Sequence, residues 1–143
     1  MVLPDVNVLI YAHREESEKH DQYLAWLEGL WSGVTRYGYS ELVLSSCVRV
    51  LTHKDVFRPP TPMDAVLAYV DQIRDHPNAV RIAPGDRHWS IFRDLCRRGD
   101  ARGNLVTDAY LAALAIESGS EWITTDRDFA RFPGLKWRHP LDE

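Results

Sequence analysis

The chain lacks the features typical of secreted and membrane proteins. Its 143 residues include two cysteines, Cys47 and Cys96, which are too few for a disulfide framework. No apolar run approaches the roughly 20 residues that a membrane-spanning helix needs. The chain reaches an acid at Asp5 without a basic leader, which argues against a signal peptide. We therefore expect reduced cysteines, a cytoplasmic location and no membrane partner.

The chain also lacks an excess of positive charge. Its formal net charge is -4, which argues against a protein that holds nucleic acid mainly through bulk positive charge. It does not argue against a nuclease, because an acidic metal site itself lowers the net charge. The sequence has no internal repeat and no low-complexity tract, and its 45% hydrophobic content is ordinary for a globular protein. Length and composition together predict a single domain over residues 1–143.

The chain does contain a regular alternation of strand-like and helix-like segments. The expected strands are the start of the chain up to about Pro4 and residues 34–39, 79–82, 122–124 and 135–137. The expected helices are residues 17–31, 40–54, 63–75, 86–98 and 104–118, with a helical turn at 126–132. In the helix at 86–98, one side carries Trp89, Phe92, Leu95 and Cys96. The alternation predicts an α/β fold in which helices flank a central, mostly parallel sheet of four or five short strands.

Four acidic residues stand in or beside apolar stretches, where a carboxylate is costly unless something neutralises it. They are Asp5, Glu41, Asp108 and Asp126. Asp5 and Asp126 each come at or just after the end of an apolar strand, and ligands of parallel α/β folds bind beyond such ends. Each of these two aspartates could instead simply cap the helical segment that follows it.

Asp108 lies on an apolar helix. On a helical wheel it is opposite Glu117 and shares its side with Ala112 and Ala115, which predicts an inward-facing carboxylate. Asn104 lies one turn earlier on that side and could hold the carboxylate or a metal-bound water. The alternative is a buried acid that backbone or serine donors satisfy.

Glu41 stands in the first turn of its expected helix, directly after Ser40, an expected N-cap. The helix macrodipole favours an acid at this position wherever its side chain points. On the wheel, however, Glu41 borders the apolar stripe that includes Leu44 and Cys47, so it need not face open water.

The four acids together predict a metal site. Like charges that crowd together raise one another's pKa unless a cation intervenes, and oxygen-only ligands favour Mg²⁺ or Mn²⁺ over zinc. Such a site is the usual apparatus for hydrolysing phosphodiesters. The residues expected to bind the metal and to carry catalysis are Asp5, Glu41, Asp108 and Asp126. The residues expected to support them are Asn7, Asn104 and Thr125, although Thr124 offers the same hydroxyl group.

The acidic segments resemble the motifs of the PIN-domain nucleases and, within them, of the VapC toxins of type II toxin–antitoxin pairs. The resembling segments are residues 5–12 (DVNVLIYA), 40–43 (SELV), 108–115 (DAYLAALA) and 124–129 (TTDRDF). Each motif is short, but the four occur in the family's order, and the resemblance covers nearly the whole chain.

This resemblance implies a PIN-like three-layer sandwich and endonucleolytic cleavage of RNA with Mg²⁺ or Mn²⁺. It also implies a homodimer and a cognate, VapB-like antitoxin that blocks the site. Basic residues near the acidic motifs are the candidates for holding RNA at its phosphates: Arg14, Arg97, Arg98, Arg102 and Arg127. Each of these arginines could equally be a solvated surface charge.

Other functions fit part of the pattern. A catalytically silent PIN-like module that only docks a protein or an RNA would not need four intact acids. A Mg²⁺-dependent phosphatase with an aspartyl nucleophile would need a second aspartate close to Asp5, where the chain has Asn7. The 6 histidines are the remaining candidate ligands, and their spacings match no zinc motif.

Overall fold

Short parallel strands meet in the middle of the molecule. In the computed structural model, which describes residues 1–142, β1 (Val2–Pro4) pairs with β4 (Glu121–Ile123), and β4 pairs with β5 (Trp137–Arg138). β2 (Tyr37–Tyr39) pairs with β3 (Ala79–Arg81), and every one of these pairs is parallel. β2 lies against β1, since a Cβ built on Gly38 would come 3.5 Å from the Val2 carbonyl oxygen. The strands therefore follow the order β3-β2-β1-β4-β5, in two hydrogen-bonded groups that abut.

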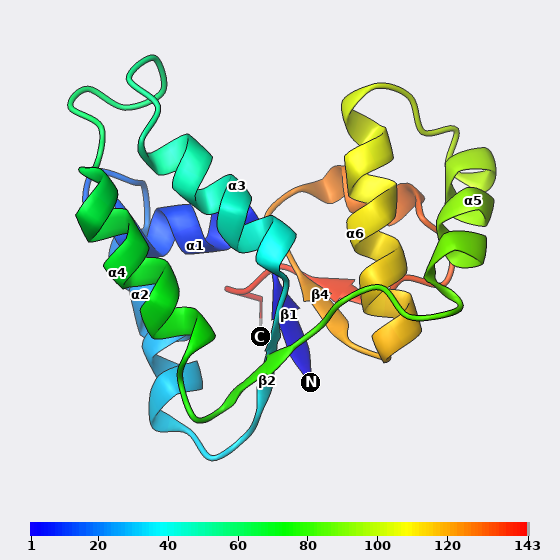
Figure 1. The fold of residues 1–143 in the computed structure, drawn as a ribbon, viewed down its shortest axis with the longest axis horizontal. Coiled ribbons are helices and arrows are strands. Elements are labelled where there is room, and N and C mark those ends of the chain that lie inside the picture. The colour runs from blue at the N-terminus through cyan, green and yellow to red at the C-terminus, as the bar shows by residue number, and fades with distance from the viewer. Residues whose placement is uncertain (143) are drawn as a thin grey trace.

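Helices cover these strands from two sides. One group contains α1 (Val6–His13), α2 (His20–Ser32), α3 (Glu41–Leu51) and α4 (Met63–Arg74). The other contains α5 (His88–Arg98) and α6 (Asn104–Ser118), and Figure 1 shows the two groups on opposite sides of the strands. A short 3₁₀ helix, η1 (Arg127–Arg131), follows β4. This arrangement confirms the predicted α/β layering with helices on both faces.

The element boundaries follow local sequence signals. β1 ends at Pro4, which cannot donate to a strand ladder. Ser40 caps α3, because its hydroxyl accepts a hydrogen bond from the Val43 N–H at 3.4 Å. α6 has the predicted bounds, whereas α3 ends at Leu51, short of the expected end near residue 54, and β2 covers only the last three residues of the expected 34–39. β2 is therefore shorter than the apolar pattern predicts.

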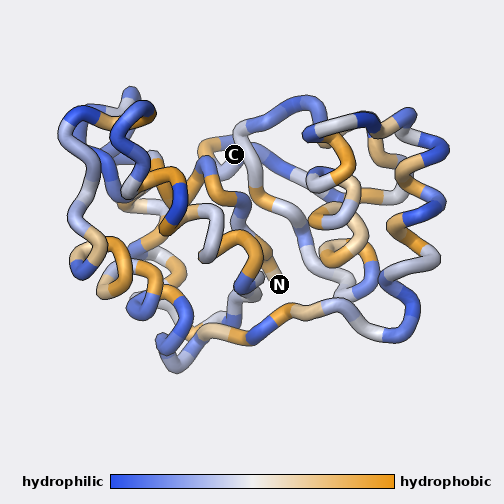
Figure 2. The backbone as a smooth tube through the Cα atoms, turned by 45° about the horizontal axis from the view of Figure 1, so that its top comes forward, coloured by the Kyte–Doolittle hydropathy of each residue, from blue (hydrophilic) through white to orange (hydrophobic). Residues whose placement is uncertain are grey.

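The core lies between the strands and the inner faces of the helices. Figure 2 shows that hydrophobic residues gather in these inner segments and that hydrophilic residues follow the outer loops. Trp122 on β4, Tyr37 on β2 and Leu27 on α2 are fully buried. On α6, five consecutive residues from Leu111 to Ala115 are buried. This apolar packing supports the strand ends, where the candidate site lies.

The apolar side predicted for α5 is exposed to solvent at Trp89. Trp89 is 64% exposed, whereas His88 is 2% exposed. The His88 Nε2 atom lies 3.0 Å from the Tyr110 carbonyl oxygen, and its ring packs edge-on against the Tyr110 ring. These contacts with α6 orient α5 through the histidine, so the neighbouring tryptophan faces solvent.

Both cysteines are free thiols. Cys47 is buried in the core, where burial raises its pKa to about 12, and Cys96 is half-buried. Within residues 1–142, no helix combines the length and the apolar character that crossing a membrane requires.

Candidate active site

Asp5 joins β1 to α1 and is nearly inaccessible to solvent. It is the N-cap of α1, because its Oδ1 atom accepts a hydrogen bond from the Val6 N–H at 2.7 Å. Its Oδ2 atom accepts bonds from the Thr124 hydroxyl at 2.7 Å and from the Asn7 side-chain amide at 3.3 Å. Burial nevertheless raises the pKa of Asp5 to about 6, and the charge of Asp126 adds to that rise. Capping alone therefore does not neutralise this carboxylate.

The segment after β4 places Asp126 beside Asp5. The register of β1 and β4 continues through a bond from the Asp5 N–H to the Ile123 carbonyl oxygen at 2.8 Å. The Thr124 hydroxyl donates to Asp5 and also accepts from the Asp126 N–H at 3.0 Å. Asp126 itself caps η1 through the Asp128 N–H at 2.9 Å. One buried hydroxyl thus joins the two acidic segments.

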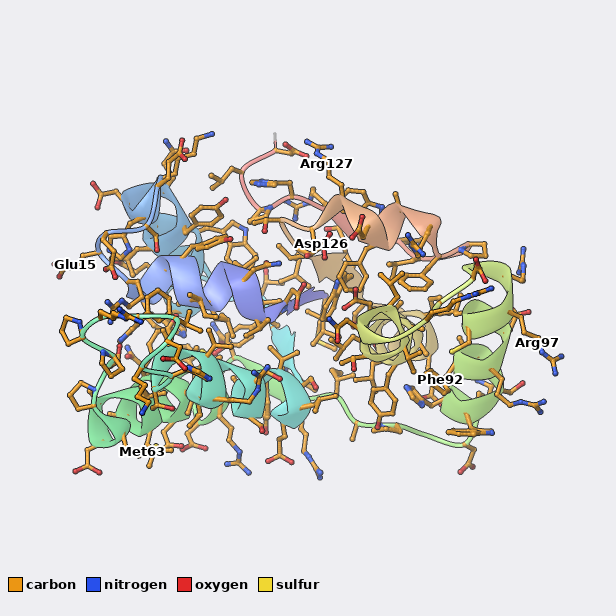
Figure 3. All side chains as sticks on the ribbon, turned by 90° about the horizontal axis from the view of Figure 1, so that it is seen from above. Glu15, Met63, Phe92, Arg97, Asp126 and Arg127 are labelled. Atoms are coloured by element: carbon orange, nitrogen blue, oxygen red, sulfur yellow. The ribbon has the colours of Figure 1, made fainter. Side chains whose placement is uncertain are left out.

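Asp108 reaches the same place from α6. Burial first, and then the negative charges of Asp5, Asp126 and Asp128, raise its pKa to about 6, although Arg131 acts in the opposite direction. Figure 3 shows Asp126 at the centre of the molecule, between α1 and α6. Strand ends and the inward side of α6 therefore bring three predicted acids together.

The predicted inward side of α6 is observed in the packing around Asp108. Ala112 and Ala115, its predicted neighbours on the wheel, have no solvent exposure. Asp108 itself is only half-buried, so its carboxylate lies where the apolar face of the helix meets the site. Glu117, on the opposite side, accepts bonds from the backbone N–H groups of Gly85 and Arg87.

The negative charge at Asp5, Asp108 and Asp126 fits a divalent cation. The raised pKa values of Asp5 and Asp108 mean that burial and mutual repulsion outweigh the hydrogen bonds around them. The side chains of residues 1–142 do not by themselves close into a ligand cluster of three or more. The donors are nevertheless all carboxylate oxygens, which Mg²⁺ and Mn²⁺ prefer, and a divalent cation would offset the repulsion.

Glu41 is not part of this group in the structure. Its carboxylate accepts a hydrogen bond from Arg74 Nε at 3.2 Å and forms an ion pair with Arg81, whose Nε atom lies 2.9 Å away. The glutamate side chain is 45% exposed. Glu41 begins α3 directly after β2, as predicted, but its side chain turns toward the ends of β3 and α4. Its place in the site thus remains a prediction.

The predicted supporting residues have different surroundings. Asn7 binds Asp5 and also donates to the Thr124 hydroxyl oxygen at 3.3 Å. The Thr125 N–H donates to Asn7 Oδ1 at 3.3 Å, so the contribution of Thr125 to this network comes from its backbone. Asn104 is an exposed residue in the first turn of α6.

The predicted RNA-binding arginines are not gathered at the acids. Arg14 holds the loop before α4, through bonds to the Pro59 carbonyl oxygen and the Thr61 hydroxyl. Arg98 pairs with Asp94, and Arg102 pairs with Asp100. Figure 3 shows Arg97 pointing outward from α5, away from Asp126, and Arg127 at the outer edge above Asp126. Of these five, only Arg127 directly adjoins an acid of the site in sequence.

Sequence reasoning missed or undervalued three residues. Thr124 was a second choice to Thr125, yet its hydroxyl is fully buried and bonds to Asp5. Thr124 stands two residues before Asp126, a spacing at which a threonine hydroxyl often accepts a bond from the backbone N–H. This spacing could be read from the sequence alone. Asp128 and Arg131 act on Asp108 through charge, and only the fold of η1 reveals this.

Comparisons with known proteins agree with this geometry. The model of the PIN domain family matches residues 2–135. Ribonuclease VapC43 from Mycobacterium tuberculosis is 47% identical over 143 residues, covering 99% of this chain and 97% of that protein. The chain also resembles a chain in the structure of VapBC2 from Rickettsia felis bound to promoter DNA, with a TM-score of 0.70 at 18% identity. That alignment covers 97% of this chain and 98% of the other.

A further solved structure has the same fold. VapC20 from Mycobacterium tuberculosis, described as a toxin that cleaves the sarcin-ricin loop, aligns with a TM-score of 0.64 at 17% identity. The alignment covers 95% of this chain and 99% of VapC20. At such low identity the structural likeness concerns the fold alone, whereas the family model and the 47% identity concern the sequence. The chain therefore belongs to the PIN-domain family and, within it, to the VapC ribonucleases.

Proposed function

We propose that this protein is a metal-dependent endoribonuclease that acts as the toxin of a toxin–antitoxin pair. The observation that carries the proposal is the convergence of Asp5, Asp108 and Asp126, whose charges repel one another at the ends of parallel strands. A binding module would not need to keep such a costly arrangement. Membership of the VapC ribonucleases supports RNA as the substrate.

The three aspartates would hold Mg²⁺ or Mn²⁺. When bound, such a metal lowers the pKa of water and offsets charge that develops on the scissile phosphate. Thr124 fixes the orientation of Asp5, and the caps of α1 and η1 fix the backbone at Asp5 and Asp126. Glu41 would join this group by exchanging its two arginine partners for the metal or its water.

The proposal also names partners. We expect a cognate VapB-like antitoxin that covers the acidic site, by analogy with the relatives solved as VapBC complexes. We further expect a homodimer, a cytoplasmic location, and one domain over residues 1–143. Arg127 lies beside Asp126 and is the arginine best placed to hold a phosphate of the RNA.

The test is cleavage of end-labelled cellular RNA by the purified protein. Reactions with Mg²⁺, with Mn²⁺ and with chelator are compared for the wild type, Asp5→Asn and Asp108→Asn. Discrete fragments that require the metal and vanish in both variants support the proposal, and the fragment ends identify the target. Metal-independent fragments, or equal cleavage by either variant, would contradict it.

A further inference from the structure

A hollow of about 370 Å³ lies between α1, α2 and the segment that follows β4. It is lined by Tyr11, Ser17, Glu18, Lys19, Tyr23 and Thr125. Thr125 directly precedes Asp126, and its N–H bonds to Asn7, which in turn bonds to Asp5. A molecule seated in this hollow would therefore lie next to the acidic site.

Two tyrosine rings form one wall of the hollow, and neighbouring side chains hold them in place. The ring of Tyr11, on α1, lies 5.2 Å from the ring of Tyr23, on α2, at an angle of 49°. Tyr23 is buried, and its hydroxyl lies 3.4 Å from His139 Nε2. His20 Nδ1 lies 2.8 Å from the Tyr11 carbonyl oxygen. Tyr11 itself is half-buried, so part of its ring remains open to the hollow.

The rim of the hollow is polar and carries both donors and acceptors. Ser17, Glu18 and Lys19 come from the connection between α1 and α2. Within residues 1–142, Lys19 lies within ion-pair distance of no carboxylate, so its ammonium group is free for an anionic ligand. Stacking on an aromatic ring, with polar groups at the edges and a cation nearby, is how proteins hold single-stranded RNA bases.

We infer that this hollow is a nucleobase subsite, which holds the base of a nucleotide next to the scissile phosphate. The inference rests on the proposed function, because it concerns the RNA that the acidic site would cut. The volume of the hollow lies in the range of small-molecule sites, and Tyr11 provides the stacking surface. Lys19 would contact an adjacent phosphate, and the rim of Ser17 and Glu18 would meet the edge of the base.

An exposed aromatic elsewhere on the surface provides a control. Trp89 on α5 lies beside basic side chains, since Arg93 and Arg97 line the same hollow. That surface is remote from the acids, since Figure 3 shows Arg97 on the far side of α5 from Asp126. A general affinity of exposed aromatics for RNA would act at Trp89 as well as at Tyr11, whereas a subsite beside the acids would act only at Tyr11.

The experiment measures binding of fluorescein-labelled single-stranded RNA decamers (oligo-A, oligo-C and oligo-U) by anisotropy, in chelator so that nothing is cut. Tyr11→Leu keeps apolar bulk but removes the ring, and we expect it to weaken binding of at least one decamer at least about fivefold. Tyr11→Phe keeps the ring, and Trp89→Leu alters the control surface, so both should bind within about twofold of the wild type. Thermal melting of each variant shows that it folds.

Binding by Tyr11→Leu equal to that of the wild type would overturn the subsite, as would equal losses in Tyr11→Leu and Trp89→Leu. Should Tyr11→Leu melt early, Tyr11→Phe and Tyr11→Trp replace it, and an unchanged preference among decamers in Tyr11→Trp overturns the subsite.

Cleavage in Mn²⁺ distinguishes failure of the subsite from failure of the proposed function. A wild type that binds RNA through Tyr11 but never cuts it would refute the proposed function alone. A Tyr11→Leu variant that cuts at the same positions with the same KM would refute the subsite alone.

Discussion

Two acidic regions lie near the ends of neighbouring strands, and their surroundings are opposite. Asp5, after β1, is 4% exposed and shares its space with the charges of Asp108 and Asp126. Glu41, after β2, has a side chain that is 45% exposed and that forms ion pairs with two arginines. The first region holds uncompensated negative charge, whereas the charge of the second is already balanced. A cation would therefore offset the negative charge around Asp5, whereas arginines already offset the charge of Glu41.

This difference shows why the position of an acid does not determine its role. A strand end or first helical turn accepts a carboxylate for local reasons, through capping and the helix dipole. What would distinguish a metal site is burial and repulsion of carboxylates that the protein itself leaves unrelieved. By this criterion we propose that Asp5 and Asp108 belong to the metal site, and Glu41 would need a rearrangement before it could join them.

The largest expected effect is on RNA cleavage in the aspartate region. Asp108→Asn and Asp5→Asn remove one charged oxygen ligand each while conserving shape, so we expect cleavage rates to fall by at least about 100-fold. Initial rates on a labelled RNA in Mn²⁺ measure the loss. Asp71→Asn, an exposed acid on α4, is the control and should cleave as the wild type does. If Asp108→Asn retained more than a tenth of the wild-type activity, Asp108 would not belong to the site.

The next expected effect is on stability against pH. In chelator, folded Asp5 has a pKa of about 6, well above its ordinary value in the unfolded chain. Between about pH 4 and pH 6 the folded state therefore binds more protons, and its stability falls as the pH rises through 6. For Asp5 this loss is at most about 3 kcal/mol.

Urea unfolding at a series of pH values measures this dependence. Asp5→Asn should weaken it without abolishing it, since asparagine also caps helices and does not titrate, whereas Asp108 still does. Mg²⁺ should raise the stability of the wild type most above pH 6, where the carboxylates are ionised. A wild type whose stability rises with pH across the same window, with Asp5→Asn parallel to it, would contradict the assigned surroundings of Asp5.

A smaller effect is expected at Glu41, and it sharpens the comparison between the two regions. If Glu41 leaves its arginines to act on the metal or the attacking water, Glu41→Gln should reduce cleavage about tenfold, less than the aspartate changes do. Its melting temperature in chelator should stay close to that of the wild type, because exposed ion pairs contribute little. Cleavage at the wild-type rate would leave Glu41 as a structural partner of Arg74 and Arg81.

The smallest effect is expected from the arginines themselves. Arg81→Ala removes one exposed partner of Glu41 and should change the free energy of unfolding by less than about 1 kcal/mol, with still less change at high salt. Chemical unfolding at low and at high salt measures this difference. A loss of several kcal/mol would mean that this pair is structurally as important as the buried network of Asp5 and Thr124.

The sequence predicted the order and layering of the helices and strands better than it predicted the contacts between side chains. Alternating segments, Pro4 and Ser40 indicated the layers and several boundaries, because these signals are local. The convergence of Asp5, Asp108 and Asp126 followed from strand ends and from one helical face, and charge interactions link the three in the structure. The binding partners of Glu41 depend on where β3 and α4 end relative to α3, which no local pattern reports.

The other differences have the same origin. The sequence places Trp89 on the apolar side of α5, but contacts between His88 and Tyr110 decide how α5 faces α6, and Trp89 is exposed. Thr125 and Thr124 were chemically equivalent in the sequence, and only the pairing of β1 with β4 brings Thr124 onto Asp5. Contacts between segments far apart in the sequence therefore determined these positions, which local sequence patterns could not.

The most direct test of the central claim is a calorimetric titration of Mn²⁺ into the wild type, Asp5→Asn, Asp108→Asn and Glu41→Gln at neutral pH. If three aspartates form the metal site, the wild type and Glu41→Gln bind the ion, and both aspartate variants lose most of their affinity. Undiminished binding by Asp5→Asn and Asp108→Asn, or binding lost only in Glu41→Gln, would place the metal in the other region and contradict the account.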